Sequence, residues 1–135
     1  MWPGGPRGSA FVVAKPYFEI QRSLRSSIEA RNAFTSNQEE IANIQGTWER
    51  SRRLGPGDGP SRVTYIFSEH EFRLTARGAS STSGTFKINN DILMMITNND
   101  IIGLFVVEYK PDNVVFLHNI YLHDNFWSGG EFSKQ

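Results

Sequence analysis

Closely spaced arginines follow a tryptophan in this chain, and two of them are placed to bind an anion. Arg50 and Arg52 come two and four residues after Trp48. Residues two apart on a β-strand point to the same side, so both guanidinium groups would share a face with the indole. A guanidinium binds a carboxylate or a phosphate through paired hydrogen bonds. If this face is the inner one, Arg50 and Arg52 would bind the head group of a ligand. If the strand leaves the core here, both are solvated.

The histidines offer one further candidate side chain. His118 shares its parity with Val114, Phe116 and Ile120, so an inward face would place the imidazole in an apolar interior. There it would be either a hydrogen-bonded core histidine or a residue that orients a ligand. His118 and His123 are an odd number of residues apart and would point to opposite sides of a continuous strand. No histidine pair is therefore spaced to bind a metal.

Composition and missing motifs exclude several classes of function. The chain has no cysteine, which excludes disulfides, thiolate nucleophiles and cysteine zinc sites. Lys and Arg total 14, as do Asp and Glu, and a balanced charge argues against binding to nucleic acid or to an anionic membrane. No apolar run approaches the roughly 20 residues of a membrane span. Motifs of nucleophilic triads, phosphate loops and dinucleotide turns are absent. No motif therefore supports the further alternative of a barrel enzyme, such as a cyclase or isomerase, and we expect no cofactor.

Aromatic side chains are the other feature that could contact a ligand. Phenylalanine alone accounts for 10 of the 135 residues. The residues that we predict to line a ligand-binding interior, together with Arg50, Arg52 and His118, are Tyr65, Phe67, Phe72, Phe86, Met94, Phe105 and Phe116. An eight-stranded barrel is wide enough either for packed side chains or for one small ligand. The sequence leaves both alternatives open.

An antiparallel sheet must position these side chains. Apolar and polar residues alternate in short segments that tight turns separate, and this pattern predicts strands at 46–50, 63–67, 72–74, 84–88, 92–97, 101–109, 114–122 and 126–134. Asn-rich turns at 89–91 and 98–100 favour hairpins, because Asn tolerates a positive φ. About eight strands at this spacing predict a mostly β fold, an up-and-down barrel whose closure removes exposed strand edges.

The region before the strands has the spacing of helices. Ile20, Leu24 and Ile28 fall on one stripe of a helix within residues 19–45. This stripe is too narrow to stand alone in water, because isolated short helices are marginal. The helix must therefore pack on its own barrel or on a second copy of the chain. We divide the chain into an N-terminal arm, 1–45, and a barrel, 46–135.

A second, shorter helix is indicated just before the first strand. Ser36 and Glu39 have the spacing of a capping box, in which the hydroxyl and the carboxylate each bind an exposed backbone N–H. Ile41 and Ile44 then share one face. We expect this face to pack against the barrel.

The first strand also carries a family resemblance. Gly46-Thr47-Trp48, after a short helix, resembles the G-x-W motif of lipocalins, and the hairpin rhythm of residues 41–135 is similar to that of small bacterial lipocalin-like domains. The resemblance implies that Trp48 plugs one end of the barrel while Gly46 lets the backbone pass close beneath it. Many lipocalins stack an arginine near the last strand on this tryptophan, and Lys134 is the nearest substitute here.

These observations lead to two functional hypotheses. The first is non-enzymatic binding of a small apolar or amphipathic molecule inside the barrel. The alternative is a protein-interaction or assembly module that uses the barrel as a platform and the N-terminal helix as its contact, for example in a homo-oligomer. The first residues lack the apolar segment of a signal peptide. This favours the cytoplasm if Met1 is the native start, and a removed export signal otherwise.

Overall fold

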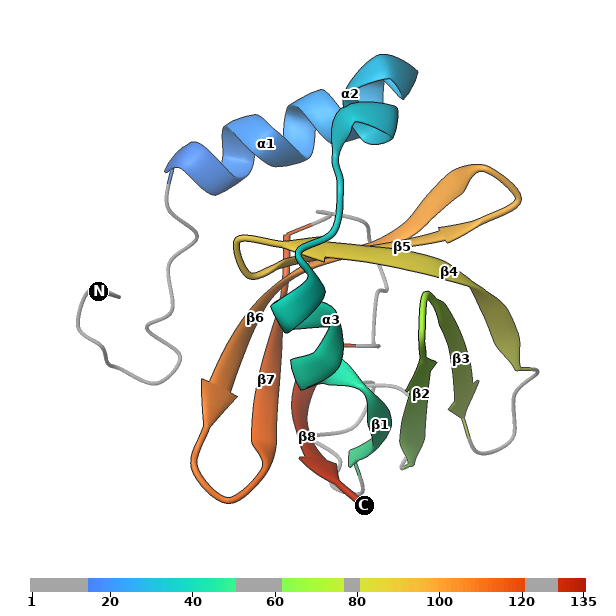
Figure 1. Cartoon of the computed structure of the whole chain (residues 1–135), viewed down its shortest axis with the longest axis vertical. Helices are drawn as coiled ribbons and strands as arrows, with labels where there is room; N and C mark the ends of the chain where they lie inside the picture. Colours follow the sequence, from blue (N-terminus) through green and yellow to red (C-terminus); the bar gives the residue numbers. More distant parts are fainter. Residues whose placement is uncertain (1–14, 51–61, 77–80, 121–128) are drawn as a thin grey trace.

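Eight antiparallel strands close into a barrel in which each strand pairs with the next along the chain, and the last pairs with the first (Figure 1). The computed structural model describes residues 15–50, 62–76, 81–120 and 129–135. The strands are β1 Gly46–Arg50, β2 Val63–Ser68, β3 Glu71–Ala76, β4 Thr82–Asn89, β5 Ile92–Thr97, β6 Asp100–Lys110, β7 Val114–Asn119 and β8 Gly130–Lys134. The predicted barrel is confirmed. The predicted strand residues at 121–122 and 126–128 lie outside the described residues.

Short polar turns fix the register of the hairpins. Asn90 and Asp91 join β4 to β5, and Asn98 and Asn99 join β5 to β6, all with positive φ values between 52° and 68°. Asn and Asp adopt this left-handed conformation at lower cost than other non-glycine residues. Two consecutive residues of positive φ give a turn whose twist matches that of antiparallel strands. The turns predicted at these positions are confirmed.

A short helix lies across one end of the barrel (Figure 1). This helix, α3 Gln38–Ile44, buries Ile41 and Ile44 in the interior cluster of the barrel. Its N-cap is Asn37, whose side chain accepts the Glu40 N–H at 3.1 Å. The predicted cap at Ser36 is therefore wrong. The Ser36 hydroxyl instead accepts the N–H of Ile88 on β4, at 3.1 Å, because β4 extends past the start of β3 and needs an acceptor there.

The N-terminal arm contains two helices rather than one. Helix α1, Lys15–Ser26, is followed by α2, Ile28–Ala33, and Ser27 separates them as the N-cap of α2. The Ser27 hydroxyl accepts the N–H of Ala30 at 3.1 Å, which satisfies a backbone donor at the start of α2. This break rotates Ile28 away from the stripe that it was predicted to share. Ile28 is 67% exposed, whereas Leu24 is 3% exposed.

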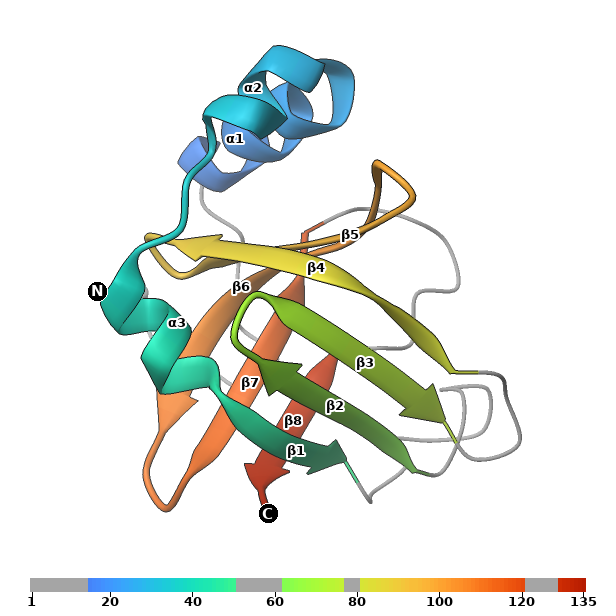
Figure 2. The ribbon, with the colours of Figure 1, turned by 45° about the vertical axis from the view of Figure 1, so that its right-hand side comes forward.

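Helices α1 and α2 lie on the outside of the barrel, beside β4 and β5 in both ribbon views (Figures 1 and 2). Leu24 packs in an apolar cluster with Met94 of β5 and with Leu104 and Val106 of β6. The structure thus places the arm on its own barrel, one of the two positions that the stripe predicted. In the described part of the chain, no helix is long and apolar enough to cross a membrane.

Truncation of Leu24 tests this docking against a matched position. Leu24→Ala removes a buried side chain, so we expect the free energy of unfolding to fall by about 2–5 kcal/mol. Ile28→Ala, in the same arm but exposed, should change it by less than about 0.5 kcal/mol. Urea denaturation of both variants measures the difference. Equal losses would contradict the packing of α1 on β5 and β6.

Candidate functional site

The G-x-W segment and the last strand meet at the end of the barrel that α3 covers. Trp48 is 3% exposed, and its indole N–H donates to the Ile44 carbonyl at 2.8 Å. The Lys134 ammonium lies over the indole, 5.6 Å from the ring centroid, within the range of a cation–π contact. Gly46 has φ +116°, and a Cβ there would lie only 2.9 Å from Cε of Lys134. Gly46 and Trp48 therefore both contact Lys134, and it is this side chain, not the backbone, that passes close to Gly46.

Most of the predicted aromatic lining forms a packed cluster inside the barrel. The ring of Tyr65 stacks on Phe67 at 5.5 Å between centroids and lies 5.2 Å from Phe132. Phe67 in turn meets the edge of Phe86 at 5.1 Å. Phe72 and Phe105 are buried in the same cluster. These rings contact one another, so this region is packed core of the kind found in small closed barrels.

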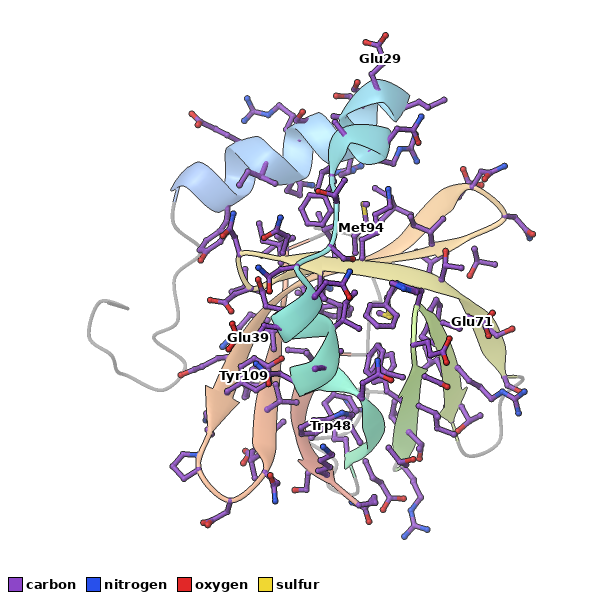
Figure 3. The ribbon with its side chains drawn as sticks, in the orientation of Figure 1. Glu29, Glu39, Trp48, Glu71, Met94 and Tyr109 are labelled. Atoms are coloured by element: carbon purple, nitrogen blue, oxygen red, sulfur yellow. The ribbon has the colours of Figure 1, made fainter. Side chains whose placement is uncertain are left out.

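Three predicted lining residues lie on the outer face instead. Met94 belongs to the cluster beneath α1, and Figure 3 shows it between β5 and the helices of the arm. On β7 the buried interior positions are Val115 and Leu117, so the alternating positions Phe116 and His118 point out of the barrel. The prediction failed because both faces of β5 and β7 carry apolar residues, so alternation cannot say which face is inside. On β5 the arm covers the outer apolar face, where Met94 packs with Leu24.

His118 has a structural environment on this outer face. Its Nε2 lies 2.8 Å from Oε1 of Glu108, and its ring stacks on Phe116 at 4.4 Å. Burial lowers the pKa of His118 below its ordinary value of 6.5, an effect that the hydrogen bond to Glu108 opposes. We therefore assign His118 the role of a hydrogen-bonded histidine that joins β6 to β7. In the described residues, no group of three or more histidine and acidic side chains could hold a metal.

Arg50 is the predicted site residue that combines charge with burial. It is 4% exposed, and its Nη1 donates to the Gly129 carbonyl at 2.7 Å. The alternation of β1 places it on the same inner face as Trp48, so the alternative in which Arg50 is solvated is wrong. Arg52 lies outside the described residues.

Small and aliphatic residues surround Arg50 on the inner wall, and the sequence analysis missed them. The wall continues from Arg50 to its partner Val63 on β2, and from Val63 to Ala76 on β3. On the other side, a Cβ on Gly130 of β8 would lie 3.2 Å from Cδ of Arg50, and Gly130 pairs with Leu117 of β7. We call these five residues the Arg50 arc. The sequence could have indicated three of them, because Val63, Ala76 and Gly130 each lie two residues from a large apolar residue on the same strand. These apolar residues are Tyr65, Leu74 and Phe132, and residues two apart on a strand point to the same side.

A hollow of about 600 Å³ is present elsewhere, on the outer face of β2, β3 and β4. Its lining includes the exposed Ile66, Glu71 and Arg73, and Figure 3 shows Glu71 at the edge of the molecule. Phe72 contributes to the lining too, although its own side chain is buried in the interior cluster. The polar groups of this hollow are exposed to solvent, so it lacks the enclosed character of most ligand sites.

Substitution of Trp48 tests its role as the plug of the barrel. Trp48→Ala should lower the free energy of unfolding by about 3–5 kcal/mol, because it deletes a large buried ring. Trp48→Phe keeps an aromatic ring but leaves the Ile44 carbonyl without its indole donor, so we expect a loss of about 1–3 kcal/mol. Guanidinium denaturation compares the two variants. A loss below about 1 kcal/mol for Trp48→Ala would contradict the plug.

Titration of His118 tests the environment that the structure gives it. Followed by NMR of the ring protons, its midpoint should fall below pH 6.5 and shift further down in Glu108→Gln, which removes the opposing carboxylate. With a lowered pKa in the folded state, the unfolded chain binds the proton more readily. The stability that His118 contributes is then fully present above pH 6.5 and is lost as the pH falls. A midpoint above 6.5 would refute this assignment.

Comparisons with known proteins found no match: no family model, no curated protein and no solved structure matches this chain. The closed barrel of eight antiparallel strands is compatible with a lipocalin-like fold. The contact among Gly46, Trp48 and Lys134 agrees with the resemblance seen in the sequence.

Proposed function

We propose that this barrel binds a small apolar or amphipathic molecule against the Arg50 arc. The observation that carries the proposal is the unequal size of the inward side chains. Near α3 the interior holds the ring cluster around Tyr65 and Phe67, which is already packed. Farther along β1 from α3, the wall holds Arg50, Val63 and Ala76. A ligand inside the barrel would therefore bind against this arc rather than among the rings.

The Arg50 arc has the mixture of groups that small-molecule sites use. Such sites are mainly apolar, with a few fixed polar groups that orient the ligand. Val63, Ala76 and Leu117, which belong to the same buried cluster as the rings, supply apolar side chains from three different strands. The ring of Phe105 reaches towards the same wall, because its Cε1 would lie 3.5 Å from a Cβ added to Gly129. Arg50 supplies the polar group.

The alternative of an assembly module has less support, because the helix face that would most directly contact a partner is buried. The apolar side of α1, with Leu24, is buried against β5 and β6 of the same chain. Among the described residues of the arm, the large hydrophobic side chain that is exposed is Ile28. Binding inside the barrel therefore has the better support.

A neutral fluorescent probe tests the proposal directly. N-phenyl-1-naphthylamine should bind the purified protein with an increase in fluorescence. Ala76→Phe places a ring in the arc and should weaken this binding at least tenfold. Thr75→Phe, the neighbouring position on the opposite face of β3, should leave binding within twofold.

The folded state of both variants is checked by circular dichroism, and the smaller Ala76→Leu replaces Ala76→Phe if the larger ring prevents folding. Native mass spectrometry of the unmodified protein adds an independent readout, since a co-purified small molecule would appear as added mass. Failure of the probe to bind the unmodified protein, or equal binding by the two phenylalanine variants, would refute binding at this arc.

A further inference from the structure

We infer that two copies of this chain associate through the outer faces of β2, β3 and β4, in an antiparallel arrangement that pairs Glu71 of each copy with Arg73 of the other. Both residues line the hollow of about 600 Å³ on this face. Figure 2 shows β2 and β3 on a side of the barrel that α1 and α2 leave uncovered. The association uses the outer face, so it is separate from ligand binding against the Arg50 arc.

Glu71 and Arg73 place opposite charges on one face of one strand. They lie two residues apart on β3, and both are exposed. Within the described residues, neither side chain has an ion-pair or hydrogen-bond partner. Two residues along a strand span about 7 Å. The backbone of β3 therefore sets the spacing between one available negative charge and one available positive charge.

The hollow stays open because β4 carries small residues at this level. The register partners of Glu71 and Arg73 on β4 are a threonine and a serine, with Gly84 between them. A Cβ on Gly84 would overlap the carbonyl oxygen of Ile96, so β4 cannot carry a larger residue there. The long side chain of an arginine from a second copy therefore has room to enter this hollow.

A two-fold axis makes the pattern of charges self-complementary. If the axis runs between the two faces and crosses β3 at right angles, midway between Glu71 and Arg73, the second copy presents its β3 in the reverse direction. Its Arg73 then lies opposite Glu71, and its Glu71 lies opposite Arg73. Dimers with two-fold symmetry use the same patch on both subunits. Two unlike charges placed symmetrically about the axis meet this requirement, whereas two like charges would repel.

Two further observations favour association of two copies at this face. Ile66, the register partner of Arg73 on β2, is 39% exposed and lines the same hollow. The same axis brings the Ile66 side chains of the two copies next to each other, which removes apolar surface from water. The chain also has a formal net charge of zero, so no overall repulsion opposes self-association.

The size of the patch indicates a reversible dimer. Stable interfaces usually contain roughly 20–30 residues on each side, more than line this hollow. We therefore expect the dimer to increase with protein concentration. Added salt should weaken it, because salt screens exposed charges.

Charge reversal tests the pairing of Glu71 with Arg73. Sedimentation equilibrium of the unmodified protein should show a monomer–dimer equilibrium. Glu71→Arg leaves two positive charges in the patch and Arg73→Glu leaves two negative ones, so each variant should self-associate at least tenfold more weakly. An equimolar mixture of the two variants should form a mixed dimer. The double variant Glu71→Arg/Arg73→Glu restores one charge of each sign and should self-associate within threefold of the original.

A matched control separates the patch from the net charge. Glu131→Arg, at an exposed position of β8, changes the net charge as Glu71→Arg does and should leave the dissociation constant within twofold. Circular dichroism checks that each variant is folded, as expected for substitutions of exposed side chains. A single-chain mass of the unmodified protein at every concentration would overturn the inference. So would a dimer that persists in both single variants, a mixture of the two that stays monomeric, or equal weakening by Glu131→Arg.

Discussion

Closure of the barrel between its first and last strands is the constraint on which the rest of the structure depends. β1 and β8 share only two register pairs, Trp48 with Lys134 and Glu49 with Ser133, whereas β1 and β2 share five. Because the β1–β8 ladder is this short, side chains and backbone groups outside the ladder must also hold the two strands together. The Lys134 ammonium lies over the indole, the Gln135 N–H donates to the Thr47 carbonyl at 2.8 Å, and Arg50 donates to Gly129. Without these contacts both strands would become open edges that could pair with other chains.

Turn chemistry and alternation made the barrel predictable, because both are local. Asn and Asp at the hairpin positions adopt positive φ, which sets where strands begin and end. What alternation could not supply was the identity of the inner face. Met94, Phe116 and His118 were predicted inward because their strands are apolar on both sides. The outer apolar side of β5 and β6 exists because Leu24 and its neighbours cover it, and no periodicity within a strand reveals a helix packed from outside.

The helices show the same limit at shorter range. The spacing of Ile20, Leu24 and Ile28 is compatible with one continuous helix, and only the hydrogen bond from Ala30 to the Ser27 hydroxyl shows that the chain restarts there. Ser36 and Asn37 are both good N-cap residues. The choice between them depends on Ile88, more than fifty residues away, whose N–H donates to the Ser36 hydroxyl. Local propensity thus gave the correct type of element but not its boundary, since a distant strand decided which side chain was available to cap it.

The position of Arg50 was likewise predictable only as far as local properties of its strand determine it. Parity with Trp48 indicated the shared face, which is a local property of β1. Whether that face could hold a guanidinium depended on two glycines about eighty residues later. Gly129 supplies the carbonyl that accepts from Arg50, and Gly130 leaves room for the arginine because it has no side chain. The same arginine therefore lines the interior and joins β8 to β1. A ligand bound at the Arg50 arc would lie beside the seam that closes the barrel. By linkage, a ligand that binds only the closed barrel stabilises it in proportion to its occupancy. Ligand recognition and barrel closure would then depend on one side chain.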